Sequence, residues 1–189
     1  MKNRVQYILT SLLVLIVAGC ASYPAERSVQ EAAQLCLGHS NLPAGLISKF
    51  EATEDKRLLN DALGKPDKGK LCQGKVYKTK QNAQVTIFRA WNSTNPNSRF
   101  GKWWAFNKPS GKVADYRSSY EICYQWSSLD KLVRCHLKPG VSVVVGTGQS
   151  AKCSDYLTYP VSDKQQIYID KASVSVENCT IFDGEFSWK

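Results

Sequence analysis

The chain has 189 residues, of which 43% are hydrophobic and 22% charged, and its formal net charge is +9 at pH 7. This length suits one domain with a proper hydrophobic core and would crowd two full domains. It also excludes a pure disulfide scaffold, in which cysteines replace the core. The basic residues are scattered. We expect their densest run, residues 65–80, to be a solvated loop, and we do not expect a nucleic-acid partner.

The first segment has the order of a secretory signal. Lys2 and Arg4 precede an apolar run from Tyr7 to Val17, and small residues lead to Cys20. The apolar run is shorter than the roughly 20 residues of a membrane-spanning helix, which disfavours the alternative of a retained signal-anchor helix. We expect a signal peptide over 1–19 and a tether over 20–27.

The stretch that ends at Cys20 resembles the lipobox of bacterial lipoproteins. The resemblance implies a lipid anchor, including palmitate, on Cys20, and cleavage before this residue. Ala21 is not the aspartate that retains lipoproteins at the inner membrane, so the resemblance favours the outer membrane of a bacterial envelope. The anchor makes the membrane a partner of the chain.

Setting Cys20 aside leaves an even number of cysteines. In an oxidising compartment they form up to three disulfides, with 15 pairings open. The candidates are Cys36, Cys72, Cys123, Cys135, Cys153 and Cys179.

Residues 28–80 read as a helical lead-in with a basic loop. Ser28 and Glu31 fit a capping box at the start of a helix that ends at Gly38. The leucine spacing over 41–63 predicts one or two short helices, and residues 64–74 are rich in Gly, Lys and Pro, typical of a loop.

Residues 81–189 read as a β-rich domain that forms one globular unit with the lead-in. A helix is expected over 113–123, with Tyr116 and Tyr120 on one face, and a turn over 146–150. The expected strands are 84–91, 102–106, 132–137, 141–145, 166–169, 180–182 and 186–188. The fold class is therefore α+β, with a short helical lead-in before a mixed, mainly antiparallel sheet stapled by disulfides.

Arg89 is the residue that most directly indicates a ligand-binding site. Strand alternation puts it on the same face as Ile87 and Trp91, where a cation needs an anion. Its partner is an internal carboxylate or a bound phosphate or carboxylate, unless the side chain faces solvent. His39 and His136 have no metal-ligand spacing to acidic residues, so no metal is expected.

The order of Arg89 on a strand, Gly101–Phe106, Tyr116, and Gln166 before Ile167 resembles the ADP-ribosyltransferase superfamily over residues 84–172. The resemblance implies NAD as substrate, with Arg89 on its phosphates. It also implies that Trp103, Trp104 or Tyr116 stacks on the nicotinamide or adenine, and that Gln166 orients the ribose. Arg89 and Gln166 would then be the catalytic pair.

This chain departs from the family at two motifs. The central Ser-Thr-Ser is replaced by aromatic residues, and Gln166 stands where the catalytic glutamate is expected. Members with glutamine there resemble NAD glycohydrolases, so the resemblance implies NAD cleavage by hydrolysis or ADP-ribosyl transfer, or a fold kept without activity. His136 is the nearby candidate for proton transfer, with an ordinary surface histidine as the alternative.

A second hypothesis needs no enzyme. A small basic lipoprotein of the envelope can bind a protein, as an inhibitor or exclusion factor does, or a cell-wall glycan. Its tryptophans would then supply the core and an interface anchor. These are Trp91, Trp103, Trp104 and Trp126.

Overall fold

The computed structural model describes residues 35–183 and 186–187, which belong to one compact unit beginning at Gln34. Cys20, the expected signal peptide and the tether lie outside these residues. Of the helix expected over 28–37, only residues 35–37 are described, and these are not helical. Across the described ranges, no helix is long and apolar enough to cross a membrane.

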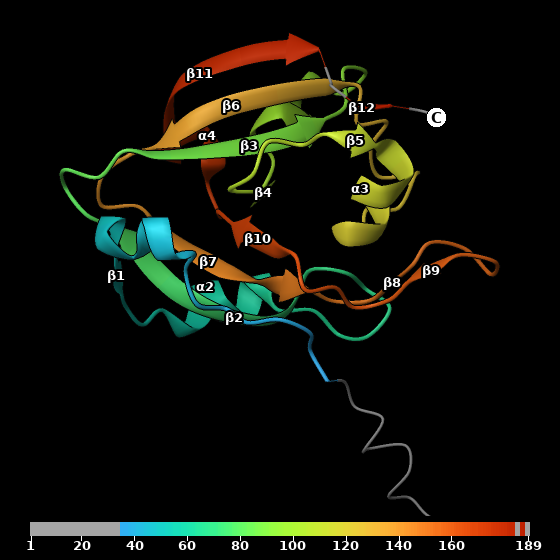
Figure 1. The fold of residues 1–189 in the computed structure, drawn as a ribbon, viewed down its shortest axis with the longest axis horizontal. Helices are drawn as coiled ribbons and strands as arrows, with labels where there is room; N and C mark the ends of the chain where they lie inside the picture. Colours follow the sequence, from blue (N-terminus) through green and yellow to red (C-terminus); the bar gives the residue numbers. More distant parts are fainter. Residues whose placement is uncertain (1–34, 184–185, 188–189) are drawn as a thin grey trace, which may run out of the picture. The chain divides into compact units, whose positions relative to one another are not determined.

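The larger of two main sheets has five antiparallel strands in the order β1-β2-β7-β10-β4 (Figure 1). Its strands are β1 (Phe50–Ala52), β2 (Leu71–Thr79), β7 (Ser142–Gly148), β10 (Gln165–Tyr168) and β4 (Trp103–Trp104). β4 is shorter than the strand expected over 102–106.

Strand β2 was not predicted. It corrects the loop expected over 64–74, which ends at Lys70, and the solvated loop expected over 65–80, most of which is strand. Val76 packs on one face of the sheet and Tyr77 on the other, so the strand is covered on both sides. Lys75 and Lys78 interrupt the hydrophobic periodicity from which a strand is usually predicted. The lead-in is therefore part of the sheet and not a purely helical segment.

The smaller sheet has three antiparallel strands in the order β11-β6-β3, namely β11 (Val176–Asp183), β6 (Lys131–Leu137) and β3 (Val85–Trp91). The turn at Pro139–Gly140 lies between β6 and β7, as predicted. These strands belong to different sheets, so the turn carries the chain from one sheet to the other.

One hydrophobic core lies between the two main sheets. Val143, Val145 and Ile167 reach it from the larger sheet. Ile87 and Val133 reach it from the smaller one and, like the other three, are fully buried. The alternation of apolar residues in β3 and β6 therefore places one face of each strand in this core.

Helices are few and short. α2 (Lys56–Ala62) packs Leu58 and Ala62 on the opposite face of the larger sheet, and its N-cap Asp55 accepts a hydrogen bond from the Leu58 amide. α3 (Val113–Ser119) is shorter than the helix expected over 113–123. The remaining elements are η1 (Ala44–Lys49), η2 (Pro96–Phe100), α4 (Ala172–Ser175), β5 (Gly111–Lys112) with β12 (Phe186–Ser187), and β8 (Ala151–Lys152) with β9 (Thr158–Tyr159).

The segment after β4 joins the two main sheets. Trp104 in β4 pairs with Ile167 of β10, and the next residue, Ala105, exchanges two backbone hydrogen bonds of 2.8 Å with Phe88 of β3. Strands β3 and β10, which are far apart in sequence, are thereby held beside the same short segment.

The six cysteines within the described residues form three disulfides, which confirms the expected number and resolves the pairing. Cys36 bonds to Cys72, Cys123 to Cys153, and Cys135 to Cys179. The second of these ties the chain after α3 to the residues that follow β8.

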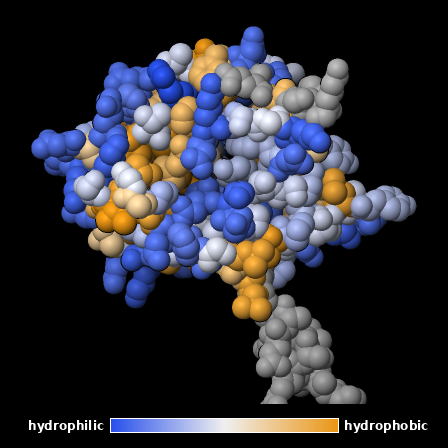
Figure 2. All heavy atoms as spheres, viewed as in Figure 1, coloured by the Kyte–Doolittle hydropathy of each residue, from blue (hydrophilic) through white to orange (hydrophobic). Residues whose placement is uncertain are grey.

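The face in Figure 2 is largely hydrophilic with separate apolar patches. The described chain begins with two exposed leucines, Leu35 and Leu37, and Tyr156 is 99% exposed. The fold therefore leaves several large apolar side chains in solvent.

Removing the Cys123–Cys153 disulfide should lower the free energy of unfolding by about 3 kcal/mol, because the bond closes a long loop in the unfolded chain. Urea unfolding of the Cys123→Ala/Cys153→Ala variant measures this. The variant should also be cleaved faster by protease around Trp126, whereas Cys36→Ala/Cys72→Ala should leave that segment as resistant as wild type. Equal resistance in both variants would contradict the local role of this bond.

Candidate functional site

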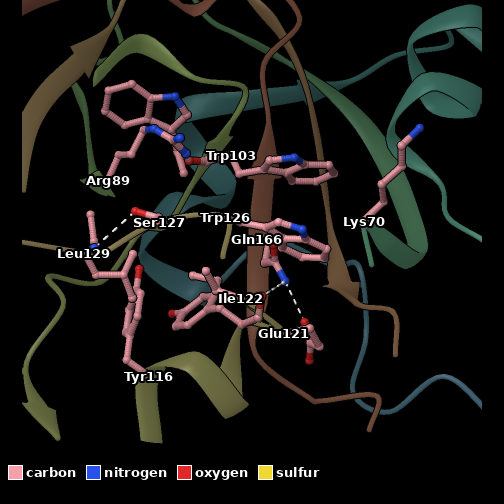
Figure 3. A pocket seen from close by; sticks show the side chains of 13 residues that line it. Lys70, Arg89, Trp103, Tyr116, Glu121, Ile122, Trp126, Ser127, Leu129 and Gln166 are labelled. Atoms are coloured by element: carbon pink, nitrogen blue, oxygen red, sulfur yellow. Dashed lines mark hydrogen bonds between the residues drawn. The ribbon is translucent and has the colours of Figure 1, made fainter. Parts of the chain in front are cut away.

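A cavity of about 150 Å³ is lined by residues of β3, β4, β10 and α3 and of the segments before β2 and after α3 (Figure 3). All the residues assigned from the sequence to catalysis or NAD binding line it: Arg89, Trp103, Trp104, Tyr116 and Gln166. Their positions in the chain are widely separated, so tertiary structure brings them together.

Arg89 is held by the loop that precedes β4. Its Nε donates to the Ser98 carbonyl at 2.8 Å, and its Nη1 donates to the Trp103 carbonyl at 2.6 Å. A Cβ on Gly101 would lie 2.3 Å from Nη2, so a larger residue there would have to displace the guanidinium. Burial lowers the pKa of Arg89 to about 10, and among the described residues no carboxylate forms an ion pair with it.

Aromatic rings form much of the cavity wall. Trp103 packs against Tyr168 with ring centroids 5.0 Å apart, and Tyr116 packs against Tyr120 at 4.5 Å. The two tyrosine rings lie together, but α3 ends at Ser119, so Tyr120 follows the helix and is not on its face as predicted. Trp126 is 52% exposed. In Figure 3 its indole lies below that of Trp103, with Gln166 beneath both. This wall suits the stacking of a planar or cyclic ligand.

Gln166 is buried, and its amide hydrogens are directed at protein acceptors. Its Nε2 donates to Glu121 Oε2 at 2.8 Å and to the Tyr120 carbonyl at 3.4 Å. A backbone carbonyl can only accept, so the amide nitrogen must face Tyr120 and Glu121. The carbonyl oxygen of Gln166 is then the atom left to accept a hydrogen bond from a ligand.

Glu121 is a carboxyl group in this cavity that the sequence analysis did not identify. It is 2% exposed, and its Oε1 is buried without a hydrogen-bond partner among the described residues. Burial raises the pKa of Glu121 to about 8, although hydrogen bonds from Ser162 and Gln166 oppose the shift. At pH 7 the group is therefore mostly protonated, and its charge does not compensate Arg89.

The backbone around Glu121 explains how the carboxyl group reaches the cavity. The residue follows the end of α3 with φ of +48°, and the amide of Ile122 donates to the Arg117 carbonyl. This is the C-terminal helix motif in which glycine usually occupies the left-handed position. The position of the carboxyl group also depends on Gly148, because a Cβ on that residue would lie 1.6 Å from Glu121 Oε2.

Gly148 also corrects the turn expected over residues 146–150. Gly146, Thr147 and Gly148 are the last residues of β7, and the chain leaves the strand only after them. Glycine was taken as a turn signal, but here it allows close packing against the strand. A Cβ on Gly146 would lie 1.9 Å from the Gln73 carbonyl oxygen.

His136, expected near the site as a proton-transfer candidate, does not line the cavity. It lies on β6, and its Nδ1 is 3.2 Å from Gln84 Nε2. Lys70 was not among the predicted site residues, and Trp126 was named only in the alternative without an enzyme, as part of the core or of an interface anchor. No local pattern marked Glu121, because neither its backbone conformation nor its neighbour Gly148 can be read from adjacent residues.

The described part of the chain contains no group of three His, Cys, Asp or Glu side chains placed to hold a metal ion. No protein family, curated protein or solved structure matches this chain. The chemistry of the cavity must therefore be argued from its own residues.

The stability of the protein should fall as Glu121 ionises. Its folded pKa of about 8 is above the ordinary 4.5, so its contribution to the free energy of unfolding is complete below pH 4.5 and is lost as the pH rises to about 8. Glu121→Gln cannot ionise. Its melting temperature should match wild type near pH 4.5 and exceed it at pH 8.5.

Thermal melts between pH 4.5 and 8.5 test this expectation. Asp115→Asn is the control, because Asp115 is an exposed carboxylate on α3, the helix that precedes Glu121. A constant difference between Glu121→Gln and wild type across this range would show that Glu121 titrates normally in the fold.

Proposed function

We propose that this cavity binds the nicotinamide ribose end of NAD and that the protein hydrolyses the bond between the nicotinamide and the ribose. One observation carries the proposal: Arg89, the aromatic residues and Gln166, selected from the order of sequence motifs, line a single cavity. The proposal includes an ADP-ribosyltransferase-like origin for the two-sheet fold.

The size of the cavity fits one end of the ligand and not the whole dinucleotide. About 150 Å³ admits a single ring system, whereas sites for drug-sized ligands are roughly 300–1,000 Å³. The adenosine half would therefore lie outside. Trp126 is exposed and Lys70, also exposed, lines the same cavity, so both are available to that half.

The charges of the cavity favour an anionic ligand. Arg89 has no carboxylate partner among the described residues, Lys70 adds a second cation, and Glu121 is mostly neutral at pH 7. A pyrophosphate or phosphate near Arg89 would compensate a cation that burial otherwise destabilises. Two of the five guanidinium hydrogens are engaged by carbonyls, so the contact would be made through Nη2 or the second hydrogen of Nη1.

A separate proposal concerns the location of the protein. We propose that Cys20 carries a lipid that anchors the domain in the bacterial envelope, with the outer membrane favoured by Ala21. NAD is scarce there, so the substrate would reach the site from outside the compartment or on contact with another cell.

The Cys20→Ser variant tests the anchor. Expressed in a Gram-negative host, wild type should sediment with the outer-membrane fraction and incorporate labelled palmitate, whereas Cys20→Ser should not incorporate the label. The control is Cys36→Ser, which removes a different cysteine and should keep the label. Palmitate on Cys20→Ser would contradict this assignment.

The enzymatic proposal is tested with the mature protein and NAD. Wild type should release nicotinamide and should show quenching of tryptophan fluorescence as NAD binds. Arg89→Lys should weaken NAD binding about tenfold, because lysine keeps the charge but loses the planar donor fork. Gln166→Ala should lose nicotinamide release, because the ribose acceptor is removed.

Arg134→Lys serves as the matched control, because Arg134 is exposed on β6 and bonds to Thr180 outside the cavity. It should bind and turn over NAD as wild type does. No quenching and no nicotinamide release by wild type would overturn the proposal.

A second candidate function has its own support. Trp126 at the cavity rim is 52% exposed and Tyr124 beside it in sequence is 59% exposed, an arrangement that also suits stacking on a sugar ring. Under this alternative the domain binds a cell-wall glycan or an envelope protein without catalysis. Binding of soluble peptidoglycan fragments that Trp126→Ala abolishes, without any effect of NAD, would favour it.

A further inference from the structure

Glu121 occupies a position that stability alone would not select. Its φ of +48° lies in the left-handed region, where a side chain is strained and glycine is not. Its carboxyl group is buried, and one carboxyl oxygen has no hydrogen-bond partner among the described residues. A glycine at this position would remove both costs. Strained, buried acids of this kind concentrate at functional sites.

The surroundings hold the Glu121 carboxyl group in one place. Gln166 Nε2 donates to Oε2 at 2.8 Å, and Gly148 of β7 leaves the space that this oxygen fills. The same Gln166 is the residue on which the proposed ribose contact depends. Glu121 and Gln166 therefore form one unit, with the amide fixing the carboxyl group and the carboxyl group orienting the amide.

We propose that Glu121 is the base that takes the proton from the attacking water in NAD hydrolysis, an inference that rests on the proposed function. The carboxylate lies outside the sequence motifs that resemble the ADP-ribosyltransferases. It supplies, from the end of α3, the acidic group that is missing at position 166.

The oxygen of water attacks C1′ of the nicotinamide ribose while the C1′–N bond breaks, and the electron pair of that bond stays on the nicotinamide nitrogen. Nicotinamide leaves as a neutral ring. The proton of the attacking water passes to the Glu121 carboxylate, and it is released to solvent before the next cycle. The negative charge of the carboxylate also stabilises the cationic ribose as the bond breaks.

Only the ionised form of Glu121 can act in this step. The charged and titratable groups that line the same cavity are Lys70, Arg89, Tyr116 and Tyr120. Burial raises the pKa values of both tyrosines, so neither can be the base near neutral pH. The rate of nicotinamide release should therefore rise with pH, with its midpoint near the Glu121 pKa of about 8.

The test compares wild type with Glu121→Gln. Glutamine has the shape and neutral charge of the protonated acid and can accept the same hydrogen bond from Gln166, so the fold should be kept. We expect the kcat for nicotinamide release to fall at least about 100-fold, the usual range for loss of a general base, while the Kd for NAD from fluorescence quenching changes less than threefold. Asp115→Asn, at an exposed position on the helix that precedes Glu121, should behave as wild type.

Glu121→Gly keeps the test independent of folding. Glycine relieves the left-handed backbone, so this variant should melt at or above the wild-type temperature while it loses nicotinamide release. Together the two variants separate a base from a structural residue, which would lose stability and activity together.

The outcomes are distinguishable. If wild type binds and cleaves NAD, two results overturn the role of Glu121 and leave the proposed function standing: an unchanged rate of nicotinamide release in Glu121→Gln, or a wild-type rate that is independent of pH between 6 and 9. Wild type that neither binds nor cleaves NAD overturns both.

Discussion

The segment from Trp103 to Ala105 is the constraint on which the site depends. Trp104 pairs with Ile167 of the larger sheet, and Ala105 pairs with Phe88 of the smaller sheet. This three-residue segment thus pairs with both sheets in turn, and it fixes the strand that carries Arg89 relative to the strand that carries Gln166. The buried Trp104 ring keeps the segment in place, with Nε1 donating to the Gly101 carbonyl at 2.8 Å. Without this junction nothing would hold Arg89 and Gln166 at the same cavity.

The cavity is lined by buried polar groups that lower the stability of the fold. A guanidinium is half-buried with backbone carbonyls as its partners, and a carboxyl group is buried at a strained backbone position. The apolar core between the sheets and three disulfides offset these costs elsewhere. Functional sites commonly show this division between a stabilising scaffold and a destabilised site.

Local sequence patterns predicted those elements whose residues have a strong intrinsic propensity for one secondary structure. β3 is mostly β-branched and aromatic, and its strand was predicted within one residue. β2 was missed because lysines break its periodicity, and the glycines of β7 were taken for a turn because their role is close packing. Arg89 and Gln166 were found from the order of motifs, whereas Glu121 follows a helix end with no signal in its neighbours.

The sequence by itself determined the α+β class, the excess of antiparallel strands, the even set of six cysteines and the strand that presents Arg89. Only the tertiary structure decided which cysteines pair, that β6 and β7 lie in different sheets, and that Glu121 meets Gln166 across 45 positions of chain. The physical reason is that periodicity and turn chemistry act over a few residues. The cavity instead arises from contacts between strands, whose register is fixed when the two sheets pack.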